Sequence, residues 1–118
     1  MQHRKKLNKM ARPRDHRKAL LKNLCTALVM KESLRTTRLK AKGLQAFVDR
    51  AISIAKKKDP MNANRLLKSY VYKQETANKL ISELKRRYQD RQSGFTRIYP
   101  IKNRVGDNAK LVQIDLIK

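Results

Sequence analysis

Apolar residues recur at helical spacing over long stretches of this chain. From Asp15, a good helix N-cap, the spacing predicts a helix to about residue 32. Its buried positions are expected to be Leu20, Leu24, Ala27 and Leu28. A second helix is predicted after a cap at Thr36 or Thr37, and the lysine run 56–58 closes it. Its apolar positions form one stripe, namely Ala41, Leu44, Phe47, Val48, Ala51, Ile52 and Ala55.

Two shorter helices are predicted to follow. Asp59 and Pro60 form a start signal, because an N-cap residue precedes a proline at the first helical position. The third helix is expected to anchor itself through Leu66, Leu67 and Tyr70. The fourth, over about residues 74–88, should bury Ala77, Leu80, Ile81, Leu84 and Tyr88.

The period of the pattern changes near the C-terminus. Residues 110–117 alternate between apolar and polar side chains, which predicts a half-buried strand. Residues 95–101 predict its antiparallel partner, across a turn-rich loop of about seven to nine residues. Residues 33–37 are β-prone and are interpreted as a connector or an edge strand. The predicted fold is therefore α+β, with about four helices packed on a small sheet and a C-terminal antiparallel hairpin.

The first 14 residues follow neither pattern, because they hold many cations and few apolar residues. Pro13 also disfavours helix at the residue before it. We expect a basic extended arm over residues 1–14 and a single α+β domain over residues 15–118.

Net charge narrows the functional classes. The chain has 31 Lys and Arg against 9 Asp and Glu, a formal net charge of +22 in 118 residues. Such an excess destabilises a compact domain through self-repulsion unless a polyanion neutralises it, and nucleic acid is the obvious one. The cations are spread along the whole chain, which favours a protein surrounded by phosphates on several faces.

Several other classes are disfavoured by the sequence. It has one cysteine, Cys25, and two distant histidines, so no metal site with the usual ligand spacing is evident. Its three glycines form no phosphate-binding loop and its acids show no dyad spacing. We therefore expect no enzymatic activity, no cofactor and no small-molecule substrate. Residues 24–30, the longest apolar stretch, are too few to span a bilayer, so we expect no membrane partner.

The kind of nucleic acid is less directly indicated. Aromatic residues are too scarce for successive base stacking, and neither zinc-finger spacing nor zipper heptads occur. A free-standing DNA-binding protein of nucleoid or transcription type, using the helices of residues 59–88, remains an alternative. Charge on all sides, instead of on one recognition helix, favours a folded RNA.

Five ordered motifs carry a family resemblance. They are Met1-Gln2-His3-Arg4-Lys5 with Leu7-Asn8-Lys9, His16 to Leu24, Glu32-Ser33-Leu34-Arg35-Thr36-Thr37 with Lys40-Ala41-Lys42, Gly94-Phe95-Thr96-Arg97-Ile98, and Gly106-Asp107-Asn108-Ala109. Together they resemble the large-subunit ribosomal protein seventeen family of bacterial type, also found in mitochondria. The chain departs from that pattern in a shorter opening arm, in Lys110 where proline is common, and in Gly43 where a helix former is usual.

The resemblance implies a structural constituent of the large ribosomal subunit. Its expected partners are large-subunit ribosomal RNA and neighbouring large-subunit ribosomal proteins, on the solvent side near the polypeptide exit. The expected location is the ribosome, in the bacterial cytoplasm or the mitochondrial matrix.

Four groups of residues are the candidate RNA contacts. Thr36 and Thr37 have a competing role as helix caps, and Phe95 is favoured as a core residue over an RNA-facing one. The groups are His3, Arg4, Lys5, Lys6, Lys9, Arg12 and Arg14 in the arm; His16, Arg17 and Asn23 in the first helix; Arg35, Thr36, Thr37 and Lys40; and Arg97, Lys102, Asn103 and Arg104 at the hairpin.

Overall fold

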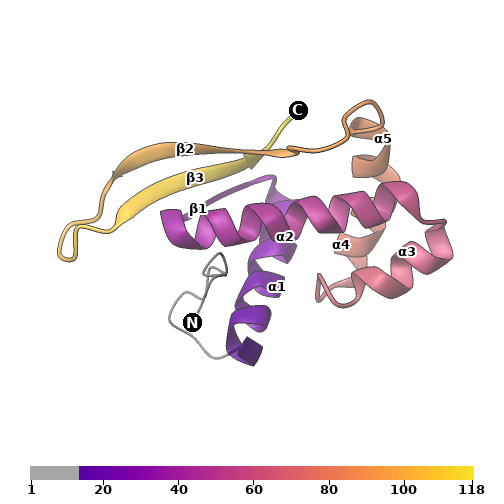
Figure 1. Cartoon of the computed structure of the whole chain (residues 1–118), viewed down its shortest axis with the longest axis horizontal. Coiled ribbons are helices and arrows are strands. Elements are labelled where there is room, and N and C mark those ends of the chain that lie inside the picture. Colours follow the sequence, from indigo (N-terminus) through magenta and orange to yellow (C-terminus); the bar gives the residue numbers. More distant parts are fainter. Residues whose placement is uncertain (1–13) are drawn as a thin grey trace, which may run out of the picture.

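A computed structural model describes residues 14–118 of the chain. The elements in order are α1 (Arg14–Lys31), β1 (Ser33–Thr37), α2 (Arg38–Lys57), α3 (Pro60–Leu67), α4 (Gln74–Lys79), η1 (Leu80–Leu84), α5 (Lys85–Arg87), β2 (Thr96–Asn103) and β3 (Lys110–Leu116). In Figure 1 the sheet lies over one half of α2, α1 crosses below that helix, and α3 to α5 gather at its other end. The predicted α+β class is confirmed: helices pack on a small antiparallel sheet.

The sheet has the strand order β1-β3-β2, and both pairings are antiparallel. Strand β1 is therefore an edge strand, one of the two interpretations offered for residues 33–37. Val112, Ile114 and Leu116 alternate toward the helices and are buried, as their spacing predicts. A register shift between Pro100 and Lys102 makes Ile101 a bulge residue.

The hairpin loop comprises residues 104–109, six residues, which is shorter than the predicted seven to nine. It is short because strand pairing continues to Asn103, and Arg104 then closes the turn by donating its N–H to the Ala109 carbonyl at 2.7 Å. Asp107 accepts a hydrogen bond from the Ala109 N–H, and Asn108 has a φ of 57°. These two residues hold the turn as expected.

Helix α2 is the centre of the core. All seven apolar positions of its predicted stripe are buried. The helix contacts all three strands and also α1, α3, η1 and α5. Its own N-cap is Thr37, at one of the two predicted positions, although the hydroxyl makes no capping hydrogen bond.

The buried face of α1 differs from the prediction. Cys25, Thr26, Leu28 and Val29 are buried, whereas Leu20, Leu24 and Ala27 are only partly buried. Figure 1 accounts for Leu20, because the first half of α1 extends beyond α2 and only its later turns are covered. Thr26 can be buried since its hydroxyl donates to the Lys22 carbonyl and accepts from the Tyr72 N–H. The helix also begins at Arg14, so Asp15 lies in its first turn and is not the N-cap.

Asp59 and Pro60 begin α3 as predicted. Leu67 is buried and the Tyr70 ring packs on Phe47, with their centroids 4.9 Å apart. Leu66, predicted as an anchor, is 39% exposed, because the short helix turns that side away from α2.

The predicted fourth helix contains a π-helical turn, η1, between α4 and α5. Ala77, Leu80, Leu84 and Tyr88 are buried, and Ile81 packs on the core while only partly buried. A wider turn brings residues four apart into line, so Leu80, Leu84 and Tyr88 share one face. Phe95 is fully buried and packs on the Tyr88 ring, so the predicted core position of Phe95 is confirmed. The Tyr88 hydroxyl donates to the Ile117 carbonyl.

Glu32 connects the end of α1 to strand β3 and to the helices that hold Lys79 and Arg87. It ends α1 with a φ of 64°, and its carbonyl accepts the Leu116 N–H. Its carboxylate pairs with Lys79 at 3.1 Å and with Arg87 at 2.6 Å. The Arg87 hydrogen bonds, followed by those of Lys79, lower the pKa of Glu32 to about 2. One carboxylate therefore connects the end of α1 to the helices that lie opposite it.

Within residues 14–118, no helix is both long and apolar enough to cross a membrane.

Leu28→Ala should lower the free energy of unfolding by about 2–5 kcal/mol, since it empties a fully buried site. Leu24→Ala, at a partly buried position of the same helix, should cost less. Urea unfolding followed by circular dichroism measures both variants. If both variants lost the same free energy of unfolding, α1 would present a different face to α2 than the structure shows.

Glu32→Gln should lower the free energy of unfolding at neutral pH by about 1–2 kcal/mol, because it removes a charge shared by two cations. The folded-state pKa is depressed, so this stabilisation is present above the ordinary pKa near 4.5 and is lost as pH falls toward about 2.

Urea titrations at several pH values between neutral and acid measure this dependence. The difference between wild type and Glu32→Gln should shrink across that interval. Glu75→Gln, on an exposed first turn of α4, is the matched control. A constant difference down to the acid end would contradict the assigned role of Glu32.

Candidate nucleic-acid interface

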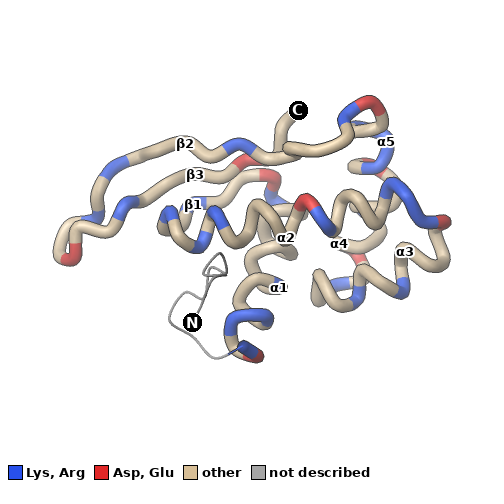
Figure 2. Tube along the Cα trace, viewed as in Figure 1, with Lys and Arg blue, Asp and Glu red and all other residues tan. Residues whose placement is uncertain are grey.

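Positive charge lies on several parts of the surface. Figure 2 shows Lys and Arg at the starts of α1 and α2, along the hairpin and near α5, with few acidic residues between them. The ion pairs within residues 14–118 engage three cations, Lys79, Arg87 and Arg104. Most of the positive charge in the described part of the chain therefore has no carboxylate partner.

Six of the candidate contacts lie outside the described residues. They are His3, Arg4, Lys5, Lys6, Lys9 and Arg12. Arg14, assigned to the arm, is the first residue of α1.

A basic hollow lies beside the first turns of α1, with a volume of about 330 Å³. Arg14 and Arg17, both predicted contacts, line it together with Lys18 and Arg50. Phe47 and Tyr70 form part of its apolar wall. Arg50 was missed because it comes from α2, and only the crossing of the two helices brings it here. His16 and Asn23 are exposed on α1 but do not line the hollow.

The group at β1 and the start of α2 is divided by the pleat of the strand. Arg35 lies opposite Gln113 on the outer face of the sheet, whereas Thr36 lies opposite Val112 on the face toward the helices. Thr37 occupies the N-cap position, and Lys40 lies in the first turn of α2. These four residues therefore do not form one patch.

The hairpin group is divided in a similar way. Arg97 and Lys102 lie on the outer face, opposite Asp115 and Leu111, while Asn103 lies on the other face opposite Lys110. Arg104 is engaged at the turn, since its Nε donates to Oδ1 of Asp107 at 3.1 Å. The hydrogen bonds from Arg104, followed by the one from the Ala109 N–H, lower the pKa of Asp107 to about 2. Arg104 thus has a structural role within the loop.

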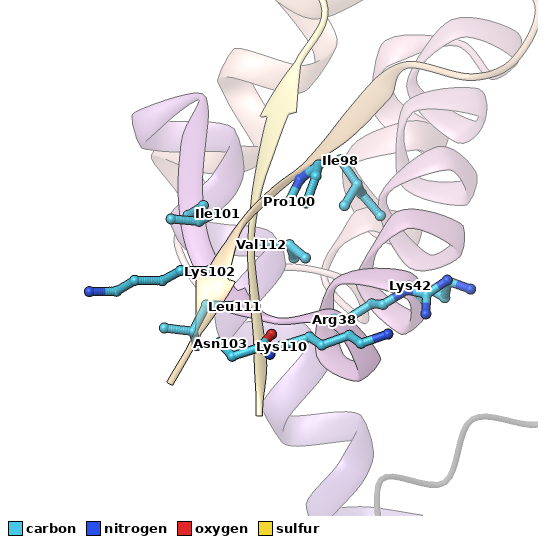
Figure 3. Close-up of a pocket in the computed structure, with 10 residues that line it drawn as sticks. All are labelled: Arg38, Lys42, Ile98, Pro100, Ile101, Lys102, Asn103, Lys110, Leu111 and Val112. Carbon is cyan, nitrogen blue, oxygen red and sulfur yellow. The ribbon is translucent and has the colours of Figure 1, made fainter. Parts of the chain in front are cut away.

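A second basic feature is a groove between the hairpin and the start of α2, with a volume of about 670 Å³. Arg38 and Lys42 of α2 and Lys110 of β3 line it, together with the predicted contact Asn103. Figure 3 shows the three cations on the same side of the hairpin as Ile98 and Pro100. The three cations were missed by the sequence prediction. Arg38 and Lys42 could have been found from their spacing of four on a helix, but Lys110 could not without the strand register.

The charges at the start of α2 act against its stability. Its first turn holds Arg38 and Lys40 and no acidic residue. Cations are unfavourable at this end because the helix macrodipole is positive there. An external anion would remove this penalty.

Uncompensated cations on several faces of a small α+β fold define a class of protein, the nucleic-acid-binding proteins that neutralise phosphates over a large surface. Residues 20–117 match the family described as ribosomal protein L17. The chain belongs to the ribosomal protein L17 family.

Relatives support this membership along the whole chain. It is 38% identical over 117 residues to the large ribosomal subunit protein bL17 of Campylobacter concisus, covering 99% of this chain and 98% of the relative. It is 40% identical to the protein of that name from Wolinella succinogenes, covering 99% of this chain and all of the relative. The protein of that name from Amoebophilus asiaticus is also 40% identical. The alignment covers 99% of this chain and 60% of that longer relative.

Lys40→Glu should raise the free energy of unfolding by about 0.5–1 kcal/mol. It creates a capping box with Thr37 and places a negative charge at the positive end of α2. The same change should weaken RNA binding if Lys40 contacts phosphate. Thermal unfolding and filter binding to large-subunit ribosomal RNA measure the two effects.

Lys40→Gln is the matched variant, because it also permits a capping box but adds no negative charge. Lys40→Gln should raise the free energy of unfolding by less than Lys40→Glu does. A loss of stability in both variants would contradict the dipole argument.

Proposed function

We propose that this chain holds segments of large-subunit ribosomal RNA together by neutralising their phosphates where they converge. Membership in the ribosomal protein L17 family makes it a structural constituent of the large ribosomal subunit and not an enzyme. Its role is then one of binding and positioning, in support of translation.

One observation carries the proposal, namely the unpaired cations on separate faces. The basic hollow lies between α1 and α2, and the groove lies between the start of α2 and the hairpin, so α2 contributes to both. Among the described residues, 14–118, no acidic residue lines either one. A single duplex passing one side of the protein would leave part of this charge unneutralised, whereas a folded RNA can approach several faces.

The proposed contacts combine predicted and newly found residues. The cations of residues 1–13 are proposed to form a basic arm that adds phosphate contacts beyond the domain, which begins with Arg14 of α1. Around that domain we propose three contact regions: the hollow with Arg14, Arg17, Lys18 and Arg50; the groove with Arg38, Lys42, Asn103 and Lys110; and the outer sheet face with Arg35, Arg97 and Lys102.

Neighbouring large-subunit proteins are proposed as further partners. The outer sheet face also exposes Tyr99 and Ile101, which are more apolar than phosphate contact requires. The relatives named above are bacterial proteins, which favours the ribosome of a bacterial cytoplasm over that of a mitochondrial matrix.

The alternative of a free-standing DNA-binding protein has no support from the family. Its proposed reading unit, residues 59–88, contributes Leu67, Ala77, Leu80 and Leu84 to the core. It also contains a π-helical turn where a straight recognition helix would be needed.

Sedimentation of the tagged full-length protein through a sucrose gradient tests the function. We expect it to migrate with large subunits and translating ribosomes, and to leave those fractions after extensive RNase treatment, because RNA holds it there. A tagged cytosolic protein of similar size is the control. Migration at the top of the gradient, or with chromosomal DNA, would overturn the proposal.

A further inference from the structure

The groove at the hairpin combines a cationic rim with an apolar floor. Ile98 and Pro100 line it, and the buried Val112 lies beside Pro100 on the neighbouring strand. The register explains this, because Ile98 and Pro100 lie opposite Ile114 and Val112 on the face of the sheet toward the helices. Figure 1 shows the hairpin extending past the start of α2, and on this face Pro100 is exposed while Ile98 is partly buried.

The rim of the groove is cationic. Arg38 and Lys42 are one helical turn apart on α2, and Lys110 begins β3 on the other side. None of the three has a carboxylate partner within residues 14–118. In Figure 3 their side chains extend over the same side of the hairpin as Ile98 and Pro100, while Ile101, Lys102 and Leu111 point to the other side.

An occupant that satisfies both the floor and the rim must be anionic at one end and flat and apolar at the other. A phosphate alone would leave the apolar floor exposed. An apolar side chain of another protein would leave three cations unpaired and partly desolvated, which is costly. An unpaired nucleotide meets both requirements, because its phosphate binds cations and its base has an apolar face that stacks on side chains.

We propose that this groove binds one unpaired RNA nucleotide, with its base on Ile98 and Pro100 and its flanking phosphates on Arg38, Lys42 and Lys110. The inference rests on the proposed RNA-binding function and specifies what this part of the surface recognises. Asn103 lies at the edge of the groove and carries an amide that can donate and accept hydrogen bonds at a base edge. A base inside a duplex cannot reach the floor, so the groove distinguishes bulged from fully paired RNA.

Two RNA hairpins test the proposal with the full-length protein. One is fully paired, and the other is identical except for a single unpaired 2-aminopurine nucleotide in the stem. Fluorescence anisotropy at near-physiological salt measures both affinities. We expect about tenfold tighter binding of the bulged hairpin, a typical contribution of one stacked base. We also expect the 2-aminopurine emission to change on binding.

Two pairs of variants locate the preference on the protein. Arg38→Gln/Lys42→Gln/Lys110→Gln should lose it, whereas Lys57→Gln/Lys58→Gln/Lys68→Gln removes three charges at exposed positions far along the fold and should keep it. Pro100→Asp should also lose it, whereas Tyr99→Asp, on the opposite face of the same strand, should keep it. Thermal unfolding of each variant checks that the fold is intact.

The outcomes separate the two proposals. Equal binding of both hairpins by the wild type, or equal preference in test and control variants, would overturn the nucleotide site while leaving general RNA binding in place. Failure to bind either hairpin, together with absence from ribosomal fractions, would overturn the proposed function itself.

Discussion

The packing of α2 is the constraint on which the rest of the fold depends. This helix has the sheet on one side and the other helices around it, so its apolar face must serve several partners. Three of its seven buried residues are alanines, Ala41, Ala51 and Ala55, which let neighbouring elements approach closely. Burial of Leu44, Phe47, Val48 and Ile52 supplies the larger apolar area. Both basic depressions lie along this helix, so its packing also sets their positions.

Scarce carboxylates are placed where they stabilise junctions. Glu32 connects the end of α1 to Lys79 and Arg87, and Asp107 holds the hairpin loop through Arg104. Asp49 accepts a hydrogen bond from the Phe95 N–H at the entrance to β2. Three of the nine acids are used in this way, and the other six are too few to neutralise the 31 Lys and Arg of the chain. The folded chain is thus stabilised locally while its outer charge stays available to phosphates.

The sequence predicted those parts of the fold that depend on local periodicity. The stripe of α2, the start of α3 at Asp59 and Pro60, and the alternation in β3 follow from spacing and capping, and the structure agrees. The buried face of α1 was mispredicted at Leu20, because which half of a helix is covered depends on where another helix crosses it. The π-helical turn has no distinct apolar pattern and was missed for that reason. Among candidate contacts, Arg50 and Lys110 were missed because tertiary crossing and strand register place them, and neither can be obtained from neighbouring residues.

The π-helical turn at Leu80–Leu84 carries one more residue than an ordinary turn would need. Loss of any single residue there would let the segment continue as a regular α-helix. The residues after it would keep their positions about the helix axis, because the wide turn is what absorbs the extra residue. Arg87 would still face Glu32, and Tyr88 would still pack on Phe95. Loss of one residue from a regular α-helix instead rotates everything after it by about 100°, so this segment should tolerate a one-residue deletion that α1 or α2 would not.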